Sequence, residues 1–244
     1  MDAIIQARLG SKRLPKKSLL SIQGRPLIGH CIDRIKEIKS IDKIIIATTS
    51  ESIDDQIEQF CRAEKIMCYR GSELNVLNRF IEASIEYKTD RFLRICGDNP
   101  FIDIKLVRAQ IESIEESDDY CSYFTKTGEN AIIKPVGFFV EAVTREALEK
   151  ASQLGAEDPM TQEHVTYYIY NHPESFNIKK LQIPSYINPD LRFTIDYSED
   201  IYVAEYILNK INKTDAKKIT NLVNSDNILY QMINRIANSK PKTY

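Results

Sequence analysis

Residues 3–17 read AIIQARLGSKRLPKK, an apolar run that leads directly into a basic loop. The run at 3–7 is typical of a short buried strand. The loop at 8–17 carries five positive charges, no acid, one glycine and one serine. Arginine and lysine form charge-assisted hydrogen bonds with phosphate oxygens, and glycine lets successive backbone N–H groups converge on an anion. The loop is therefore either a triphosphate site or a solvated basic surface.

Strand-like and helix-like segments alternate after this loop. Expected strands lie at 43–48, 67–70 and 91–95, and expected helices at 27–38, 53–60, 76–85 and 103–114, the last with Asp103 as its N-cap. This βαβ alternation with short connections predicts an α/β fold, a mostly parallel central sheet with helices on both faces. Ligands of such sheets bind beyond the carboxyl ends of the strands, which favours the triphosphate interpretation of the basic loop.

The order is looser after about residue 120. Expected strands lie at 137–141, 178–183 and 191–195, and expected helices at 144–153, 161–170 and 201–211. The composition changes at residue 213, after which six Lys/Arg, two Asp and five Asn occur, with apolar residues at helical spacing over 228–236. We therefore expect one domain over residues 1–212 and a helical tail over 213–244, which packs on that domain or on a partner subunit.

Composition excludes several classes of function. The chain has 244 residues and a net charge of −2, which argues against a nucleic-acid binder with a broad basic face. No apolar run approaches the length of a membrane span, and the N-terminal residues do not form a secretory signal, so we expect a cytoplasmic protein. Five cysteines without a C-x-x-C pair indicate reduced thiols. A second copy of the chain, forming a homodimer, is a partner that the sequence leaves open.

Two acidic residues follow strand-like segments. Asp98 lies in the turn after the strand-like part of RICGDNP, and Asp196 ends the strand-like part of LRFTIDYSED. A carboxylate at a strand end is well placed to bind Mg²⁺, which prefers carboxylates, water and substrate phosphates. Each aspartate also has a purely structural alternative: Asp98 as the cap of the turn before Pro100, and Asp196 with Glu199 as a capping box. Sequence spacing alone cannot show whether the two carboxylates converge, because they are 98 positions apart.

Two common phosphate-binding motifs are absent. No stretch fits the Walker sequence G-x-x-x-x-G-K-[ST], and Gly10 is the only glycine of its loop, so the dinucleotide motif G-x-G-x-x-G is missing too. These absences argue against a P-loop ATPase and against a hydride-transfer enzyme.

Five motifs in order resemble a known family. They resemble the cytidylyltransferases that activate 3-deoxy-manno-octulosonate and acylneuraminate, and more closely the spore-coat polysaccharide biosynthesis protein F family. The motifs are IIQARLGSKRLPKKSL, RGSELNVLNRF, RICGDNP, EHVTYYI and LRFTIDYSED, and the resemblance covers residues 1 to about 211.

The resemblance implies a nucleotide-diphospho-sugar transferase fold, Rossmann-like with three αβα layers, and Mg²⁺-dependent transfer of a nucleotide from CTP or another NTP to a small-molecule acceptor. It implies catalytic roles for Arg8, Lys17, Asp98 and Asp196, with both aspartates as metal ligands. The nucleotide-binding residues that it implies are Arg8, Leu9, Gly10, Ser11, Arg13, Lys17, Arg70, Gly71, Ser72, Cys96 and Asp98, of which Arg70, Gly71 and Ser72 lie near the base. The implied acceptor-binding residues are Glu141, His164 and Arg192.

The chain departs from the family pattern at several positions. The family commonly reads R-L-P-G-K-P, and here Lys16 and Ser18 replace the glycine and the second proline. The octulosonate enzymes carry a base-reading glutamine where Cys96 stands, so cytosine recognition is less secure than phosphate binding. The spore-coat branch often has acids where Leu74 and Asn75 stand.

The implied reaction is attack of an acceptor oxygen on the α-phosphorus of an NTP, with release of pyrophosphate. Positioning and electrostatics supply most of the rate of such transfers, so no covalent nucleophile is expected, and we interpret His164 and His172 as structural rather than as catalytic bases. Two alternatives remain: a glycosyltransferase of the same fold, although no D-x-D pair occurs, and a non-catalytic nucleotide-binding protein.

Overall fold

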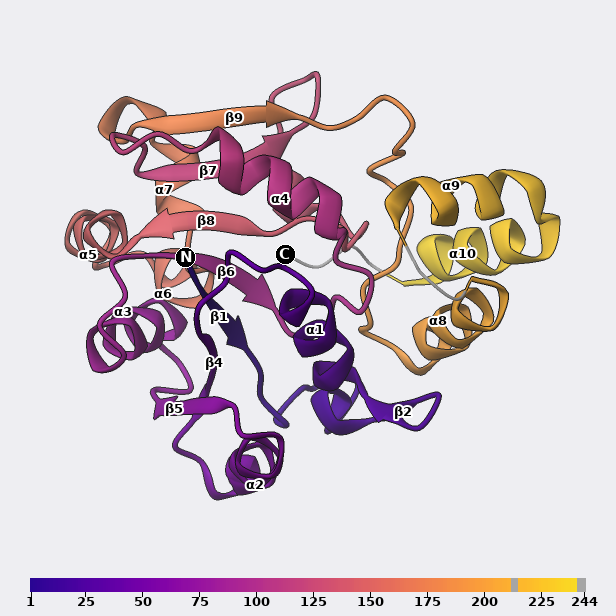
Figure 1. The fold of residues 1–244 in the computed structure, drawn as a ribbon, viewed down its shortest axis with the longest axis horizontal. Coiled ribbons are helices and arrows are strands. Elements are labelled where there is room, and N and C mark those ends of the chain that lie inside the picture. Colours follow the sequence, from indigo (N-terminus) through magenta and orange to yellow (C-terminus); the bar gives the residue numbers. More distant parts are fainter. Residues whose placement is uncertain (212–214, 241–244) are drawn as a thin grey trace.

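A computed structural model describes residues 1–211 and 215–240, and a seven-stranded sheet runs through its centre (Figure 1). The strand order is β5-β4-β1-β6-β8-β7-β9. The strands are β1 (Asp2–Gln6), β4 (Ile44–Thr49), β5 (Met67–Gly71), β6 (Arg91–Cys96), β7 (Tyr120–Phe124), β8 (Glu141–Thr144) and β9 (Ile178–Gln182), and a separate small hairpin consists of β2 (Ser21–Ile22) and β3 (Arg25–Pro26).

The sheet is mostly parallel, as expected. β1 lies between β4 and β6 and is parallel to both, and β4 is parallel to β5. β8 is antiparallel to β6 and to β7, so its first residue, Glu141, lies opposite Arg94 near the carboxyl end of β6. The reversed direction of β8 therefore places a carboxylate at the edge of the sheet where the parallel strands end.

Helices cover both faces of the sheet, which confirms the three-layer α/β fold. α1, α2 and α4 bury apolar residues against one face, and α3, α5 and α7 against the other. The helices of these two layers are α1 (Leu27–Lys36), α2 (Asp55–Glu64), α3 (Val76–Glu86), α4 (Ile104–Ser113), α5 (Arg145–Leu154), α6 (Pro159–Glu163) and α7 (Tyr167–Asn171). The described helices include none that is long and apolar enough to cross a membrane.

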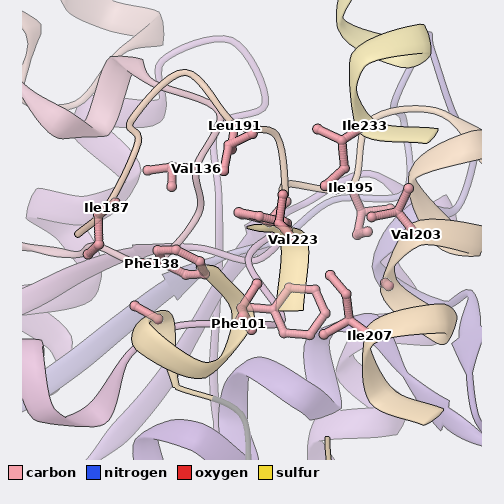
Figure 2. Close-up of a cluster of buried hydrophobic side chains, with 14 of the residues drawn as sticks. Phe101, Val136, Phe138, Ile187, Leu191, Ile195, Val203, Ile207, Val223 and Ile233 are labelled. Atoms are coloured by element: carbon pink, nitrogen blue, oxygen red, sulfur yellow. The ribbon is translucent and has the colours of Figure 1, made fainter. Parts of the chain in front are cut away.

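Three C-terminal helices gather at one end of the sheet (Figure 1): α8 (Ser198–Lys210), α9 (Ala216–Ser225) and α10 (Asn227–Ser239). Val223 of α9 and Ile233 of α10 belong to the same buried cluster as Phe101 and Phe138 (Figure 2). The tail thus consists of two helices rather than one, and they pack on the rest of the chain. The expected boundary after residue 212 falls at residues 212–214, outside the described part of the chain, and it stays a prediction.

Two expected strands are absent, for the same physical reason. Residues 137–140 form no strand, and β8 begins only at Glu141. Gly137 has a φ of 66°, and the carbonyl of Phe138 accepts the backbone N–H of Asp103 instead of a bond from a neighbouring strand. The segment 191–195 also bonds to loops, since Phe193 donates its N–H to Pro135 O. Both apolar runs are buried without a neighbouring strand, so burial alone misled the prediction.

Two other elements differ from expectation. The helix expected over 161–170 is broken into α6 and α7 around His164. β7, at residues 120–124, was not expected, because its residues YCSYF contain no run of β-branched residues like that of β4. The N-cap at Asp103 is confirmed, since its carboxylate accepts the N–H groups of Lys105 and Leu106.

Candidate active site

The basic loop folds back on itself after β1. Lys16 N–H donates to Leu9 O over 3.0 Å, and Ser18 Oγ donates to Arg8 O over 3.1 Å. Lys16 has a φ of 59°, in the left-handed region that favours glycine. Gly10, by contrast, is not among the glycines with positive φ, and Leu9 N–H donates to Asp54 Oδ1 over 2.7 Å. The backbone freedom expected of Gly10 is therefore needed at Lys16, and the amide of Leu9 is already bonded within the protein.

Lys17 joins the two aspartates that the sequence could not bring together. Its Nζ lies 2.8 Å from Asp98 Oδ2, 3.0 Å from Asp196 Oδ1 and 3.0 Å from Ile195 O. Ile195 N–H donates in turn to Asp98 O over 3.0 Å, which holds the 191–196 segment against the turn after β6. The two carboxylates therefore converge on a single cation. The structure thus argues against a purely structural role for either residue, as a turn cap for Asp98 or in a capping box for Asp196, because both side chains bind Lys17.

Asp196 is surrounded by positive charge. Arg13 Nη2 lies 2.7 Å from Asp196 Oδ1, and Arg192 Nη2 lies 3.1 Å from Asp196 Oδ2. Burial alone raises the pKa of Asp196, but Lys17, Arg13 and Arg192 outweigh that effect and hold the pKa below its ordinary value. The capping role that the sequence offered to Glu199 belongs to Asp200, which accepts the N–H groups of residues 196 and 197 and the guanidinium of Arg192.

Two cavities meet at these charged residues. The larger, of about 560 Å³, lies over the basic loop and is lined by Arg8, Ser11, Lys12 and Lys17. The smaller, of about 230 Å³, is lined by Cys96, Lys134, Tyr170, Arg192 and Asp196. The residues that line both cavities are Gln6, Arg13, Arg94, Asp98 and His164. The site therefore has two chambers with a shared wall, and one of the converging aspartates lies on that wall.

A buried polar network supports the shared wall. Glu141 is fully buried, and its carboxylate accepts hydrogen bonds from Tyr120, from Thr166 and, over 2.9 Å, from Arg94 Nη1. Arg94 Nη2 donates to Gln6 Oε1 over 2.9 Å. Burial alone lowers the pKa of Arg94, but the neighbouring Cys96 and Glu141 raise it above its ordinary value. Glu141 therefore contacts Arg94 rather than a cavity, whereas Arg94 lines both chambers.

The other residues of the resemblance fall into two groups. His164, Arg192 and Cys96 line the smaller cavity. Burial lowers the pKa of His164 and raises the pKa of the Cys96 thiol to about 12, so both are neutral at pH 7. Arg70, Gly71 and Ser72 are absent from the residues that line either cavity. Arg70 instead donates to Asp55, to Glu58 and to two backbone carbonyls at residues 49 and 51.

Gln6 and Arg79 are among the polar cavity-lining residues that sequence reasoning missed. Gln6 is the last residue of β1 and pairs in register with Cys96 of the neighbouring strand β6. Arg79 is buried on α3 and lines the larger cavity. A signal existed for each: Gln6 interrupts the apolar run 3–7, and Arg79 lies in the motif RGSELNVLNRF on a helix whose buried residues are mostly apolar.

No metal site is complete from protein side chains alone in the described part of the chain, because no three His, Cys, Asp or Glu side chains are grouped to hold an ion. The carboxylates of Asp98 and Asp196 nevertheless both reach one ammonium group. That donor set suits Mg²⁺, which proteins commonly bind through one or two carboxylates together with substrate phosphates.

Comparison with solved structures agrees with the fold. A solved cytidylyltransferase from Leptospira borgpetersenii superposes with a TM-score of 0.82 at 24% identity, covering 94% of this chain and 96% of that one. A solved CMP:2-keto-3-deoxy-manno-octonic acid synthetase, complexed with CTP, gives a TM-score of 0.66 at 19% identity, covering 86% of this chain and 98% of that one. Both share the three-layer nucleotidyltransferase fold described above.

Sequence comparison extends the likeness from fold to family. The spore coat polysaccharide biosynthesis protein SpsF of Bacillus subtilis is 32% identical over 230 residues, which cover 91% of this chain and 92% of SpsF. The family profile described as cytidylyltransferase matches residues 3–234. The match includes the basic loop, both aspartates and most of the C-terminal helices, and the chain therefore belongs to the cytidylyltransferase family.

Proposed function

We propose that this protein transfers CMP from CTP to a small-molecule acceptor and releases pyrophosphate. The observation that carries the proposal is the convergence of Asp98, Asp196 and Lys17 where the two cavities meet. One chamber is large enough for a nucleotide and is lined by the basic loop, and the other is smaller and partly apolar. The reacting atoms of two substrates would meet at the shared wall.

The larger cavity suits a triphosphate. Lys12, Arg13 and Lys17 line it from the loop after β1, and Arg8 joins them with a half-exposed side chain. Charge-assisted bonds from these groups would stabilise the negative charge that develops on the departing pyrophosphate. Only interactions that strengthen as the phosphorus is attacked accelerate the reaction, so the cations nearest the bond that breaks matter most.

The smaller cavity suits an acceptor that carries an acidic group. Arg192 and Lys134 line it, and Arg94 lies on the wall that it shares with the larger cavity. In the proposed step an acceptor oxygen forms a bond to the α-phosphorus, and the bond from that phosphorus to the oxygen bridging to the β-phosphate breaks. If the acceptor is a hydroxyl, its proton leaves to solvent or to a phosphate oxygen.

Mg²⁺ fits this site as a partner of the triphosphate. Asp98 and Asp196 are the residues that would hold it, and the ion would screen phosphate charge and polarise the phosphorus under attack. Lys17 already bridges both carboxylates. The protein's own contribution is to position the two substrates, to keep His164 neutral and to hold three cations around Asp196.

The experiment is a pyrophosphate-release screen. CTP, UTP, ATP and GTP are each combined with sugars, sugar acids and phosphorylated acceptors in the presence of Mg²⁺. We expect release with CTP and an acidic acceptor, and none when the acceptor is omitted. Omission of Mg²⁺, with EDTA added, tests the metal requirement separately.

Two results would contradict the proposal. Release from UTP, ATP or GTP but not from CTP would refute the choice of nucleotide. Turnover of a nucleotide-sugar donor, with a nucleoside diphosphate and no pyrophosphate as the product, would show the glycosyltransferase alternative instead.

The likeness to SpsF supports a place for the product in surface polysaccharide synthesis. The need for CTP as a substrate supports the cytoplasm as the location of the protein. A homodimer stays a prediction, which light scattering would test.

A further inference from the structure

Arg79 is a buried cation that the mechanism above does not use. It is the fourth residue of α3 and is only 2% exposed, yet it lines the larger cavity. Its side chain packs close to Gly71, since a Cβ added at that glycine would lie 3.1 Å from Arg79 Cγ. The arginine therefore lies beside the last residue of β5 and reaches the larger cavity from there.

The guanidinium of Arg79 has an incomplete set of partners. Nη1 donates to Ser72 O, and Nε is buried without any hydrogen bond. No carboxylate lies within ion-pair distance of it among residues 1–211 and 215–240, where Arg94 and Arg192, the other buried arginines, bind Glu141 and Asp200. A buried charge without a counter-charge is costly, so its retention next to a cavity points to a ligand that completes the set.

Nearby charges do not supply that partner. Burial, and then the positive charge of Arg8, lower the pKa of Arg79 to about 10, so it still carries its charge at neutral pH. Asp54 lies near, but its carboxylate is already bonded to Leu9 N–H and to Thr49. Glu73 lies 3.7 Å from Arg8 instead. The guanidinium keeps donors that a bound nucleotide can use, since arginine has five N–H groups.

The position of Arg79 in the cavity indicates which part of the nucleotide it meets. The cations of the basic loop form the wall that suits the triphosphate, whereas Val76 lines the cavity one helical turn before Arg79 and Ala7 lines it from the end of β1. A base is the part of a nucleotide with flat apolar faces and a polar edge. It therefore fits beside Val76 with its edge towards Arg79. Arg70, expected near the base, has its donors bound to Asp55, Glu58 and backbone.

We propose that Arg79 donates hydrogen bonds to the acceptor edge of cytosine, its ring N3 and its carbonyl O2, and so selects CTP over UTP. The proposal rests on the proposed function and names the residue that recognises its nucleotide. Uracil shares the carbonyl O2 but carries N–H at ring position 3, which opposes a guanidinium donor. A buried donor left without its acceptor discriminates strongly between two otherwise similar ligands.

Calorimetric binding of CTP, UTP and inorganic tripolyphosphate to wild-type protein, Arg79→Met and Arg79→Lys tests the assignment. We expect Arg79→Met to weaken CTP binding by roughly 10- to 100-fold, the range for a lost hydrogen bond to a charged group, and to bring the CTP/UTP affinity ratio towards one. Tripolyphosphate affinity should stay unchanged. Arg62→Met is the matched control, because the Arg62 side chain is 78% exposed on α2 and lines neither cavity.

Three outcomes overturn the assignment. An equal loss of CTP and tripolyphosphate affinity would make Arg79 a phosphate ligand. An unchanged CTP/UTP ratio would remove it from base recognition, as would a ratio that collapses in Arg70→Met and not in Arg79→Met. Wild-type protein that binds neither CTP nor UTP would instead contradict the proposed function itself, so the two failures are distinguishable.

A measurement on the unaltered protein covers the case in which the Arg79 variants do not fold. 3-Deazacytidine triphosphate carries C–H in place of the ring N3 acceptor and is otherwise matched to CTP. We expect wild-type protein to bind it at least tenfold more weakly than CTP. Equal affinities for the two ligands would overturn the role of Arg79 at N3, whatever the behaviour of the variants.

Discussion

Lys17 makes three contacts within the site, to Asp98, to Asp196 and to Ile195 O. Its ammonium group therefore holds together the turn after β6 and the segment before α8, and it also lines the larger cavity. A single lysine of the basic loop thus links the larger cavity to the geometry of both carboxylates.

We predict that Lys17→Ala raises the apparent KM for CTP by at least tenfold, because it removes a phosphate-binding cation and leaves the two carboxylates to repel each other. Steady-state pyrophosphate release at varied CTP measures this. Lys12→Ala is the comparison, with a smaller rise expected because the exposed Lys12 contacts neither aspartate. A change confined to the KM of the acceptor would show that the loop does not bind the nucleotide.

Asp98→Asn keeps the size of the side chain and removes its negative charge. We predict that it abolishes turnover while CTP binding survives weakly, because the carboxylate is one of the two proposed metal ligands. Asp90→Asn is the control, since the Asp90 side chain is 84% exposed and lies outside both cavities. Pyrophosphate release near the wild-type rate from Asp98→Asn would refute the metal assignment.

The Arg94–Glu141 pair is buried, with side chains 8% and 0% exposed. Glu141→Leu leaves a buried guanidinium without its counter-charge, so we predict a loss of about 3–5 kcal/mol in the free energy of unfolding. Urea denaturation measures it. Asp90→Asn, which breaks the surface pair with Arg145, should change that free energy by no more than about 1 kcal/mol. Equal changes in the free energy of unfolding for the two substitutions would show that the buried pair stabilises the protein no more than the surface pair does.

At the scale of elements, α9 begins at a capped end. Asp215 Oδ1 accepts the N–H of Lys218 over 2.8 Å, and its Oδ2 lies 3.1 Å from Lys105 Nζ. Burial alone raises the pKa of Asp215, but this amide and Lys105 lower it below the ordinary value of 3.8. The stabilisation from a depressed carboxyl pKa is present above the unfolded pKa and is lost as the pH falls through the folded pKa.

We therefore predict that Asp215→Ala lowers the free energy of unfolding by about 1 kcal/mol at pH 7, as for other N-cap losses, and by progressively less below about pH 4. Thermal unfolding of wild type and variant from pH 7 to pH 3 gives the difference. A gap that stays constant across this range would show that the charge of Asp215 does not contribute.

The loop between β1 and η1 (Lys17–Leu19) shows how an element accommodates a departure from its family. Lys16 adopts the backbone conformation that glycine adopts most easily, and the loop keeps its shape through the bonds of Lys16 and Ser18 to the start of the loop. The family's glycine is thus replaceable here because its conformation, rather than the absence of a side chain, is what the loop needs.

At the scale of the whole molecule, the C-terminal helices share a core with the segment that precedes Asp196. Leu229 of α10 and Val223 of α9 are buried in the same cluster as Phe193 and Ile195, and Ile195 precedes Asp196. Packing of α9 and α10 therefore supports the segment that carries one of the two site carboxylates. Such a continuous core predicts a single cooperative unfolding transition rather than separate loss of the tail.

Leu229→Ala tests this continuity against its neighbour Ile228→Ala on the same helix. Leu229 is fully buried and Ile228 is 64% exposed. We predict that Leu229→Ala lowers the free energy of unfolding by about 2–5 kcal/mol in one transition, and that Ile228→Ala changes it by no more than about 0.5 kcal/mol. Two separate transitions in Leu229→Ala, followed by far-UV and near-UV circular dichroism, would show that the tail folds independently.

The sequence by itself determined the layered α/β architecture and the basic loop. Helical periodicity and buried β-branched runs depend on neighbours within one element, so α1, α3, β4 and β6 could be predicted from residues a few positions apart. The loop at 8–17 could be interpreted for the same reason, because its charges are contiguous and follow a strand directly.

The tertiary structure alone decided how the site is assembled. Asp98 and Asp196 meet because the segment 191–195 bonds to loops instead of forming a strand. Glu141 reaches Arg94, which lines both cavities, because β8 runs antiparallel to β6. It also decided that Arg79, and not Arg70, lines the larger cavity. Such contacts join residues far apart in sequence, and their geometry follows from the packing of whole segments, which no local pattern of residue types records.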